Sequence, residues 1–395
     1  MIDVSALQAL VARPGVVQVF KALGDGQARL VGGAVRDGLL GAMVADVDVA
    51  TPLSPYEVMR RCGAAGIRTI PTGIVHGTVT ALSAGETLEI TTLRADLTTD
   101  GRHATVAFTD NWREDAARRD FTINALYFDP SSGEVHDYFG GLADLKAGRV
   151  RFIGEPLQRI AEDHLRILRF FRFTARFGAG VDEAGLAACA ARANDLMALS
   201  RERIADEWVK LLSLPEPVAT VALMLEHGLL APVLPEITAE APARLAALVE
   251  AEQAAGLTPH PLRRFAALLP GDATLCDKVA ARLKLSNKER KRLGLAAIPY
   301  AGEVPRALAY RIGVAEAQDR LLLAGRLDDA AALEGWQAPR LPVGGGQLIE
   351  RGLAPGPTVA RTLKTIEEDW VAEGFPGGER IDELVSQALA SARAS

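Results

Sequence analysis

The sequence predicts a multidomain α+β protein, with a mixed α/β head at the N-terminus and an all-α remainder. Before about residue 155, short runs rich in β-branched residues alternate with helical stretches, whereas Ala- and Leu-rich periodic segments follow. A chain of 395 residues is also long enough to bury more than one hydrophobic core. We therefore expect two to four structural units, with a boundary near residue 155.

The head should combine several short strands with helical stretches such as Pro55 to Cys62. The strands are expected at Leu30–Val31, Val47–Val49, Val75–Leu82, Thr87–Leu93 and Val135–Tyr138. Between Leu93 and Asn111 the sequence is polar and contains the turn signal Asp100-Gly101, so we expect a loop there.

The remainder should be helical, because strand signals disappear from it. Helix boundaries are expected at Gly180, Pro215, Pro217, Pro232, Pro259, Pro270 and Pro305. One helix is expected to begin at Pro156 and to continue through Arg176. Its polar side chains recur every three or four residues at Asp163, Arg166, Arg169, Arg172 and Arg176. A solvated face with ion pairs along the helix is one account of that pattern.

Composition and charge exclude several classes of protein. The net charge of −6 argues against a surface that is basic throughout, although it is compatible with a local basic stripe. Cys62, Cys189 and Cys276 are widely scattered and form neither a disulfide framework nor a zinc spacing, and the six histidines show no metal-ligand spacing. We find no secretory leader and no apolar run that is long enough to span a bilayer. We therefore expect a cytoplasmic protein.

Two glycines near the start of the chain suggest a binding site for phosphate groups. Gly32 and Gly33 follow an apolar strand, and glycines let backbone N–H groups approach a triphosphate that a Cβ would hold away. Arg36 can then grip phosphate oxygens with both arms of its guanidinium. An ordinary tight turn, in which Asp37 caps the turn or pairs with Arg36, is the alternative.

Two aspartates farther along suggest a site for metal ions. Asp46 and Asp48 are two residues apart on a predicted strand, so their side chains project to the same face and can bridge a pair of hard cations. A polar turn is the simpler account of such a pair, but Val47 and Val49 have the pattern of a buried strand face. Neither a P-loop nor a dinucleotide fingerprint is present. A phosphate cradle followed by paired metal carboxylates is typical of nucleotidyl transfer.

Five motifs in order resemble those of the class II tRNA nucleotidyltransferase and bacterial poly(A) polymerase superfamily. They are G-G-x-V-R-D at Gly32–Asp37, D-x-D at Asp46–Asp48, R-R-D-F-T-x-N-A-L at Arg118–Leu126, E-D-x-x-R at Glu162–Arg166 and E-R-x-x-x-E at Glu202–Glu207. The resemblance implies a nucleotidyltransferase head with a polymerase-beta-like sheet at residues 1–153 and a helical neck with a nucleotide-recognition helix at 154–214. A helical body at 215–300 and a helical tail at 301–395, which binds tRNA, would follow.

The resemblance also implies which residues form the site. Asp46 and Asp48 would be catalytic and would hold Mg²⁺. The nucleotide would be bound by Gly32, Gly33, Arg36, Asp37, Arg119, Asp120, Asn124, Asp163, Arg166, Arg169 and Arg172. Asp120 would orient Arg119 or Asn124. The alternative for this motif is that one of Arg118 and Arg119 is only a salt-bridge partner. A third metal carboxylate is not evident, and we do not assign Asp115 to the metal.

Asp163 and Arg166 permit a specific account of nucleotide choice. A carboxylate only accepts hydrogen bonds, and a guanidinium only donates them. Cytosine and adenine each present an amino donor beside a ring-nitrogen acceptor, whereas guanine and uracil present the reverse pattern. An Asp beside an Arg therefore matches C and A and leaves unpaired groups against G and U. The E-D-x-x-R motif implies this role for Asp163 and Arg166, with Glu162 holding the helix in place.

The resemblance thus implies template-independent addition of CMP and AMP, from CTP and ATP, to the 3′ end of tRNA. The helical body and tail would hold the tRNA by shape and phosphate contact. The alternatives are a CC-adding or A-adding enzyme, a poly(A) polymerase of the same fold, and a non-catalytic RNA-binding protein. The segment 94–111 is similar to a mobile loop beside the active site in this superfamily, unless it is a surface loop without a role. The sequence does not predict the oligomeric state.

Overall fold

A computed structural model describes residues 3–42, 44, 46–99 and 104–394. The chain forms two compact units. The first comprises Met1–Trp208 and Glu226–Val233, and the second comprises Val209–Leu225 and Leu234–Ser395. The division into head, neck, body and tail is finer than these two units and stays a prediction.

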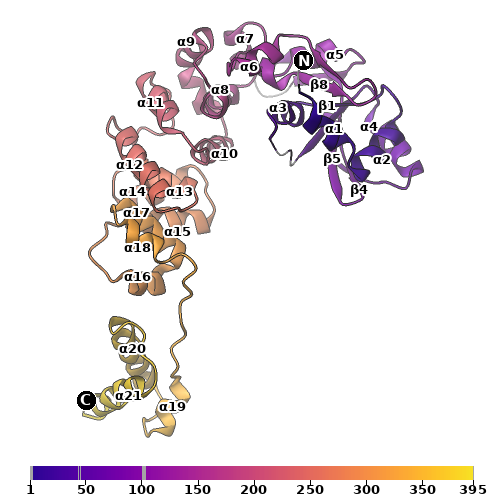
Figure 1. The fold of residues 1–395 in the computed structure, drawn as a ribbon. Helices are drawn as coiled ribbons and strands as arrows, with labels where there is room; N and C mark the ends of the chain where they lie inside the picture. Colours follow the sequence, from indigo (N-terminus) through magenta and orange to yellow (C-terminus); the bar gives the residue numbers. More distant parts are fainter. Residues whose placement is uncertain (1–2, 43, 45, 100–103, 395) are drawn as a thin grey trace. The chain divides into compact units, whose positions relative to one another are not determined.

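A seven-stranded mixed sheet forms the centre of the head, as expected (Figure 1). Its strand order is β3-β4-β5-β2-β1-β8-β9. The strands are β1 (Arg29–Val31), β2 (Val47–Thr51), β3 (Arg68–Gly73), β4 (Thr78–Ser83), β5 (Glu86–Thr92), β8 (Leu126–Asp129) and β9 (Glu134–Asp137). Only the neighbours β2 and β5 run parallel, and the other pairs of neighbouring strands in this sheet are antiparallel.

Helices enclose one face of this sheet and connect its strands. The head contains α1 (Ser5–Val11), α2 (Pro14–Leu23), α3 (Gly33–Leu39), α4 (Pro55–Ala64), η1 (Ile74–His76), α5 (Trp112–Ala117), η2 (Thr122–Asn124) and α6 (Gly141–Lys146). Both α2 and α4 pack against β4 and β5. Val47, Val49, Leu88 and Ile90 are buried in the core. Because side chains alternate along a strand, Asp48 and Glu89 project from the opposite face.

The prediction of a loop between Leu93 and Asn111 is wrong. The chain instead forms a separate antiparallel pair of strands, β6 (Arg94–Thr99) and β7 (Ala104–Phe108). The turn signal Asp100-Gly101 lies outside the described residues. The threonines of this segment favour strands, and Ala104, Val106 and Phe108 alternate in the manner of a strand, but the polar residues around the turn signal outweigh this short pattern.

The prediction of one continuous helix from Pro156 to Arg176 is also wrong. Two helices, α7 (Pro156–Glu162) and α8 (Leu165–Phe177), meet at Asp163, whose backbone is extended at φ −152° and ψ 106°. The Asp163 carboxylate accepts a hydrogen bond from the Leu165 N–H at 3.1 Å, which satisfies a donor at the start of α8. Aspartate favours a helix terminus over a helix interior. The periodic spacing of the polar residues continues across Asp163, so that spacing alone does not reveal the break.

Aromatic packing joins α8 to the head within the first unit. The Phe170 ring stacks on Phe152 with centroids 5.5 Å apart, and Phe121 packs against Phe170 and Phe173. All four side chains are buried. Three further elements follow in this region, namely α9 (Glu183–Ala191), η3 (Ala193–Ala198) and α10 (Arg201–Leu212). The arginines on the polar face of α8 are therefore held at a fixed distance from the head sheet.

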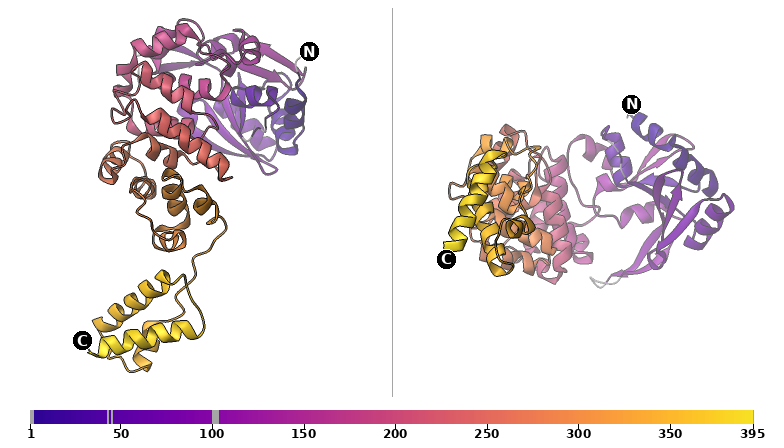
Figure 2. Two further views of the ribbon diagram at one scale, coloured as in Figure 1. Left: turned by 60° about the vertical axis from the view of Figure 1, so that its left-hand side comes forward. Right: turned by 90° about the horizontal axis from the view of Figure 1, so that it is seen from below.

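Every regular element that the structure describes after β9 is helical, as expected. The second unit contains α11 (Val218–Glu226), α12 (Ala241–Ala254), α13 (Pro261–Leu268), α14 (Ala273–Arg282), α15 (Asn287–Ala296), α16 (Pro305–Ile312), α17 (Val314–Leu323), α18 (Leu327–Ala331), α19 (Gly345–Glu350), α20 (Pro357–Ala372) and α21 (Glu379–Ala394). The proline and glycine boundaries are confirmed, since each lies between helices or at the first residue of one. The last two helices, α20 and α21, pack side by side (Figure 2). Within the described ranges, no helix combines the length and apolarity that a bilayer span requires.

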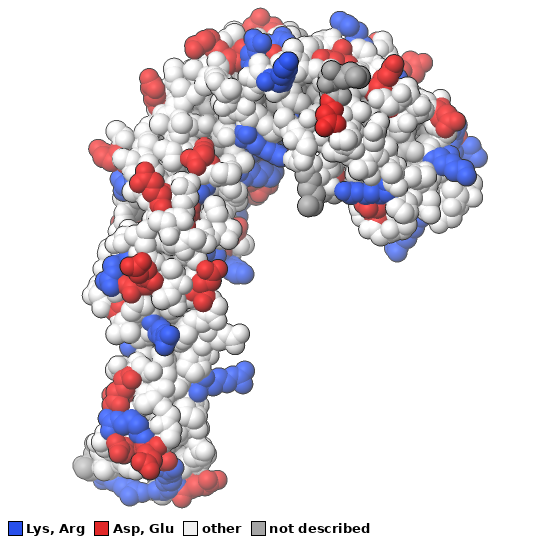
Figure 3. All heavy atoms as spheres, viewed as in Figure 1, with Lys and Arg blue, Asp and Glu red and all other residues white. Residues whose placement is uncertain are grey.

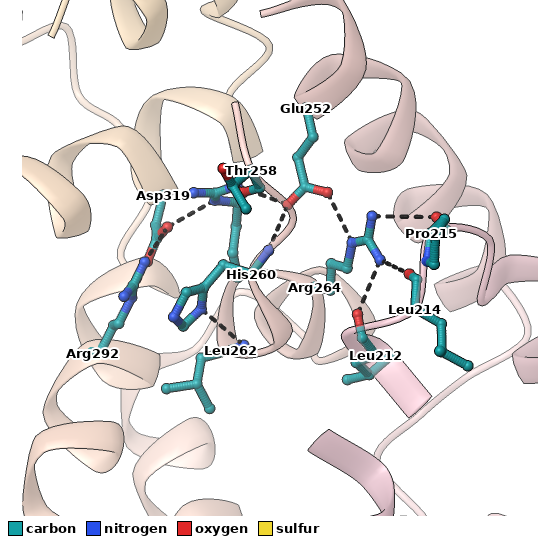
Figure 4. A network of polar contacts seen from close by, with 11 residues as sticks. Leu212, Leu214, Pro215, Glu252, Thr258, His260, Leu262, Arg264, Arg292 and Asp319 are labelled. Atoms are coloured by element: carbon teal, nitrogen blue, oxygen red, sulfur yellow. Dashed lines mark hydrogen bonds and ion pairs between the residues drawn. The ribbon is translucent and has the colours of Figure 1, made fainter. Parts of the chain in front are cut away.

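A buried ionic network connects helices of the second unit (Figure 4). The Glu252 carboxylate on α12 accepts hydrogen bonds from Arg263 and Arg264 of α13, each at 2.8 Å. Asp319 of α17 accepts from Arg263 at 2.8 Å and from Arg292 at 2.7 Å. Arg264 also donates to the backbone carbonyl of Leu212 at the end of α10, at 3.0 Å. Each buried carboxylate thus has two guanidinium partners, as charges in an interior require.

Candidate active site

The two predicted metal carboxylates lie at the edge of one cavity. Asp46 directly precedes β2 and Asp48 lies on it, as expected from the sequence. The strand register pairs Asp48 with Glu89 on β5, and Glu89 with Thr80 on β4. A cavity of about 400 Å³ is lined by these four residues together with Val47, Gly85, Glu86 and Thr87. The sequence pattern does not single out Glu86 or Glu89, because only the strand register brings them to the aspartates.

The electrostatics of this cavity are those of an uncompensated acidic site. Burial, together with the nearby charges of Glu89 and Asp46, raises the pKa of Asp48 to about 6 against the opposing charge of Arg119. The side chains that line the cavity offer oxygen atoms as ligands, which hard divalent cations prefer. Among the residues described, no group of three or more His, Cys, Asp or Glu side chains has the geometry of a complete metal site. This donor set fits a cation that takes its other ligands from phosphate oxygens or water.

The glycine turn adjoins Arg119 of the R-R-D-F-T-x-N-A-L motif. Gly32 has a φ of +66°, which favours glycine, and it precedes the first residue of α3. A Cβ at this position would lie 3.3 Å from one terminal nitrogen (NH1) of Arg119. The absence of a side chain therefore permits the backbone turn and the Arg119 guanidinium to approach each other.

Arg119 is held in place by buried polar partners. Its Nε donates to the Tyr127 hydroxyl at 3.2 Å and its NH2 donates to Asp115 at 3.2 Å. Burial alone would raise the pKa of Asp115, but Arg119, Arg118 and the Tyr127 hydroxyl outweigh it and hold that pKa at about 2. Because Arg118, Arg119, Tyr127 and the Arg94 backbone N–H occupy the Asp115 oxygens, this carboxylate organises the turn. It is not placed as a third metal ligand.

Arg36 is buried rather than extended toward solvent. Its Nε donates to Asp37 at 2.8 Å and its NH1 donates to Asn124 at 2.5 Å, and its guanidinium lies over the rings of Phe173 and Phe177. The pairing with Asp37, one of the two interpretations left open by the sequence, is therefore present. The other Asp37 oxygen accepts from Arg176 at 3.1 Å. These contacts connect α3 to η2 and α8. The Arg36 side chain does not crowd Gly33, because a Cβ at Gly33 would lie 3.6 Å from the Arg36 guanidinium, which is an ordinary van der Waals distance.

Asp120 and Asn124 continue this network across the head. Asp120 accepts from the Asn124 side-chain amide at 2.9 Å and from Arg169 Nε at 2.7 Å. Burial opposes ionisation of Asp120, but Arg169 and the hydrogen bond from Asn124 lower its pKa below the ordinary value. Of the two partners expected for Asp120, the structure shows Asn124. Arg172 is held by Glu207, which accepts from its Nε at 2.6 Å.

The structure places Asp163 and Arg166 with separate partners. Both Asp163 oxygens accept from NH2 of Arg203, at 3.1 and 2.9 Å. Arg166 donates to the carbonyl of Arg159 at 2.8 Å, to Glu162 at 2.6 Å and to the carbonyl of Arg118 at 3.0 Å. The ion pair between Arg166 and Glu162 joins α8 to the end of α7, so it does not run along one helix as the sequence interpretation supposed. No pattern in the sequence identifies Arg203 as the partner of Asp163.

Comparison with known proteins supplies independent information about the whole chain. Residues 28–151 match the family described as the poly A polymerase head domain, and residues 180–240 match the one described as the probable RNA and SrmB-binding site of polymerase A. The mitochondrial CCA tRNA nucleotidyltransferase 1 of Mus musculus is 37% identical over 387 residues, which cover 91% of this chain and 85% of that protein. The CCA-adding enzyme of Limosilactobacillus fermentum is 33% identical over 369 residues, which cover 88% of this chain and 89% of that protein.

A solved structure agrees with this comparison. The CCA-adding enzyme of Bacillus stearothermophilus in complex with CTP aligns with a TM-score of 0.70 at 27% identity. The alignment covers 96% of this chain and 98% of that one. The likeness thus extends through both the head and the helical remainder.

Proposed function

The chain belongs to the family of CCA-adding tRNA nucleotidyltransferases, and on that premise we propose that it adds CMP and AMP to the 3′ end of tRNA. CTP and ATP supply the two nucleotides, and the protein itself takes the place of a nucleic-acid template. The observation that carries the proposal is the acidic cavity at Asp46 and Asp48, close enough to Arg119 of the R-R-D-F-T-x-N-A-L motif for its charge to act on Asp48. A poly(A) polymerase would share this head, so the distinction rests on the product.

Asp46 and Asp48 would hold two magnesium ions, because they face a cavity that offers oxygen ligands and has an excess of negative charge. When bound, such ions activate the attacking ribose hydroxyl and neutralise the charge of the departing pyrophosphate. Glu89 adjoins Asp48 and keeps its carboxylate in a strongly negative environment. Asp46 is exposed at the start of β2, where the nucleotide can reach it.

The phosphate groups and sugar would be bound by the glycine turn and by the R-R-D-F-T-x-N-A-L motif. Arg119 directs one terminal nitrogen toward Gly32, so the turn at Gly32 and Gly33 and this guanidinium can contact the triphosphate together. Asn124 would contact the sugar, held by Asp120 on one side and Arg36 on the other. Arg36 and Asp37 act here by fixing the turn.

Base selection would rest on Asp163 and Arg166. The carboxylate accepts from the amino group of cytosine or adenine, and the guanidinium donates to the neighbouring ring nitrogen. Guanine and uracil would place a donor against the arginine and an acceptor against the aspartate, which leaves buried polar groups unpaired. Arg169 and Arg172 would hold the face of α8 toward the nucleotide through Asp120 and Glu207.

The helical second unit would bind the tRNA by its shape and phosphates. Basic and acidic side chains are interspersed over the face drawn in Figure 3, in keeping with a net charge of −6. A tRNA of defined shape can be held by a limited set of phosphate contacts, whereas arbitrary single strands need an extended basic path.

Labelled tRNA that lacks CCA, incubated with magnesium, CTP and ATP, tests this proposal. We expect incorporation by the native chain and none by Asp46→Ala. Calorimetry should show magnesium-dependent binding of CTP to the native chain. Binding of tRNA without incorporation and without metal-dependent nucleotide affinity would identify a non-catalytic RNA-binding protein instead.

A further inference from the structure

Asp163 stands at the junction of α7 and α8, where the helix does not fix the direction of its side chain. Its backbone is extended, and one carboxylate oxygen is used by the Leu165 N–H. The remaining contacts come from Arg203 on α10, whose NH2 bridges the two oxygens at 3.1 and 2.9 Å. A guanidinium from a separate helix therefore sets the orientation of this carboxylate.

Arg166 is secured differently. Three acceptors bind its guanidinium, and its side chain is only 12% exposed. The Asp163 and Arg203 side chains are 36% and 47% exposed, so solvent reaches both partners of their ion pair. Of the two residues proposed to read the base, Asp163 is the one whose position depends on a solvent-accessible contact.

We infer that Arg203 is a positioning residue for nucleotide selection, an inference that rests on the function proposed above. A carboxylate has about four lone-pair sites, and the Leu165 N–H and Arg203 occupy about three of them. Arg203 thereby determines which acceptor site of Asp163 remains for the amino group of cytosine or adenine.

A purely structural role for Arg203 predicts different behaviour. Half-exposed ion pairs contribute little to stability, so loss of the pair should hardly change the thermal midpoint. In contrast, misplacement of a recognition group by about 1 Å can lower the reaction rate by about 100-fold. Selectivity should therefore respond to Arg203 where stability does not.

The experiment compares Arg203→Ala and Arg203→Lys with the matched control Arg201→Ala, which removes an arginine from the same turn of α10. For each variant, kcat and KM are measured separately for CTP, UTP, ATP and GTP on tRNA lacking the appropriate 3′ residues. We expect Arg203→Ala to lower the kcat/KM preference for CTP over UTP and for ATP over GTP by roughly five- to tenfold, mainly through KM. Lysine should restore most of the preference, and Arg201→Ala should leave it unchanged.

Asp163→Ala and the double variant Asp163→Ala/Arg203→Ala separate the possible failures. If Arg203 acts through Asp163, removing Arg203 should have no further effect on selectivity once Asp163 is absent. Loss of selectivity in Asp163→Ala but not in Arg203→Ala would overturn the inference and leave the proposed function intact. Unchanged selectivity in Asp163→Ala would refute the proposed base-reading role itself. A lower thermal midpoint in Arg203→Ala with native selectivity would show that the arginine is only structural.

Discussion

At the scale of single residues, the site contains two kinds of buried carboxylate. Asp115 and Asp120 have cationic partners that balance their charge, whereas Asp48 lies among other carboxylates. Asp115 and Asp120 are buried but are surrounded by guanidinium groups and hydrogen-bond donors, so their pKa values are lowered. Asp48 faces Glu89 and Asp46, and its pKa is raised to about 6. Ionised Asp48 therefore opposes folding in the absence of a cation, whereas Asp115 and Asp120 favour folding when ionised.

Replacing Asp48 with Asn should abolish nucleotide incorporation and stabilise the metal-free protein at pH 8. The pKa of Asp48 is higher in the folded chain than in the unfolded one, so its contribution to stability is full below about pH 4 and is lost as the pH rises through about 6. After allowance for solvent screening, we expect a gain on the order of 1–2 kcal/mol in the free energy of unfolding at pH 8, and little gain at pH 4. Urea titration in EDTA measures it.

Asp129→Asn is the control of opposite sign for this measurement. Although burial opposes it, hydrogen bonds from Ser131 and the charge of Arg29 lower the pKa of Asp129, so its removal should destabilise the protein at pH 8. Equal effects of the two substitutions, or full activity in Asp48→Asn, would contradict the assignment of Asp48 to an uncompensated metal site.

Replacing Gly32 with Ala should raise KM for both nucleotides by tenfold or more. The substitution strains a residue with a φ of +66°, at a cost of roughly 1–2 kcal/mol, and it places a Cβ 3.3 Å from the Arg119 guanidinium. Gly26→Ala is a matched control, because Gly26 has a φ of +67° and open space where its Cβ would be. We expect similar losses of stability in both variants but a KM effect in Gly32→Ala alone. A native KM in Gly32→Ala would contradict the predicted phosphate site.

At the scale of elements, periodic patterns in the sequence predict the strands and helices. They do not predict contacts that depend on strand register, or a helix break that is only one residue long. Apolar alternation identifies β2 and β5, but only their parallel register places Glu89 beside Asp48. The arginines of α8 follow a helical period, yet the period conceals the break at Asp163, since one extended residue hardly disturbs the spacing. The segment that forms β6 and β7 contains the turn signal Asp100-Gly101, and only its second half, Ala104–Phe108, alternates apolar residues, so its sequence indicates a loop more readily than a strand pair.

The N-terminus of α13 provides a test of the buried network in the second unit. His260 Nδ1 accepts from the Leu262 N–H at 3.3 Å, and burial, with Arg292 and Arg263, lowers its pKa to about 4 against the opposing charge of Asp319. Because the folded pKa lies below the unfolded one, this stability is full above about pH 6.5 and is lost as the pH falls toward about 4.

His260→Asn should therefore remove part of the acid sensitivity of the protein. Asparagine retains an acceptor for the helix N-terminus but has no proton to gain. We expect urea midpoints that are similar to those of the native chain at pH 7.5 and higher at pH 5. An unchanged difference between pH 7.5 and pH 5 would show that His260 does not contribute to the acid sensitivity.

At the scale of the whole molecule, the order of the motifs reveals more than any single one. Asp46 with Asp48 could be a polar turn, and Arg166 with Glu162 could be an ordinary ion pair, but their succession along one chain indicates one family, which the identity to CCA-adding enzymes confirms. Side-chain partnerships do not follow from that order. The contacts of Asp163 with Arg203 and of Arg36 with Asn124 join residues that are 40 and 88 positions apart, so only the fold reveals them.

The number of nucleotides added to the tRNA distinguishes a CCA-adding enzyme from a poly(A) polymerase most directly. A fixed template formed by protein side chains should admit two C residues, then one A, and then stop, because the growing 3′ end fills the space. A poly(A) polymerase must instead let its primer move after each addition. We therefore predict a discrete extension by CCA on labelled tRNA that ends at the discriminator base, when CTP and ATP are supplied together. Long A tails from ATP alone on unstructured RNA, or arrest after CC with both nucleotides present, would contradict the account.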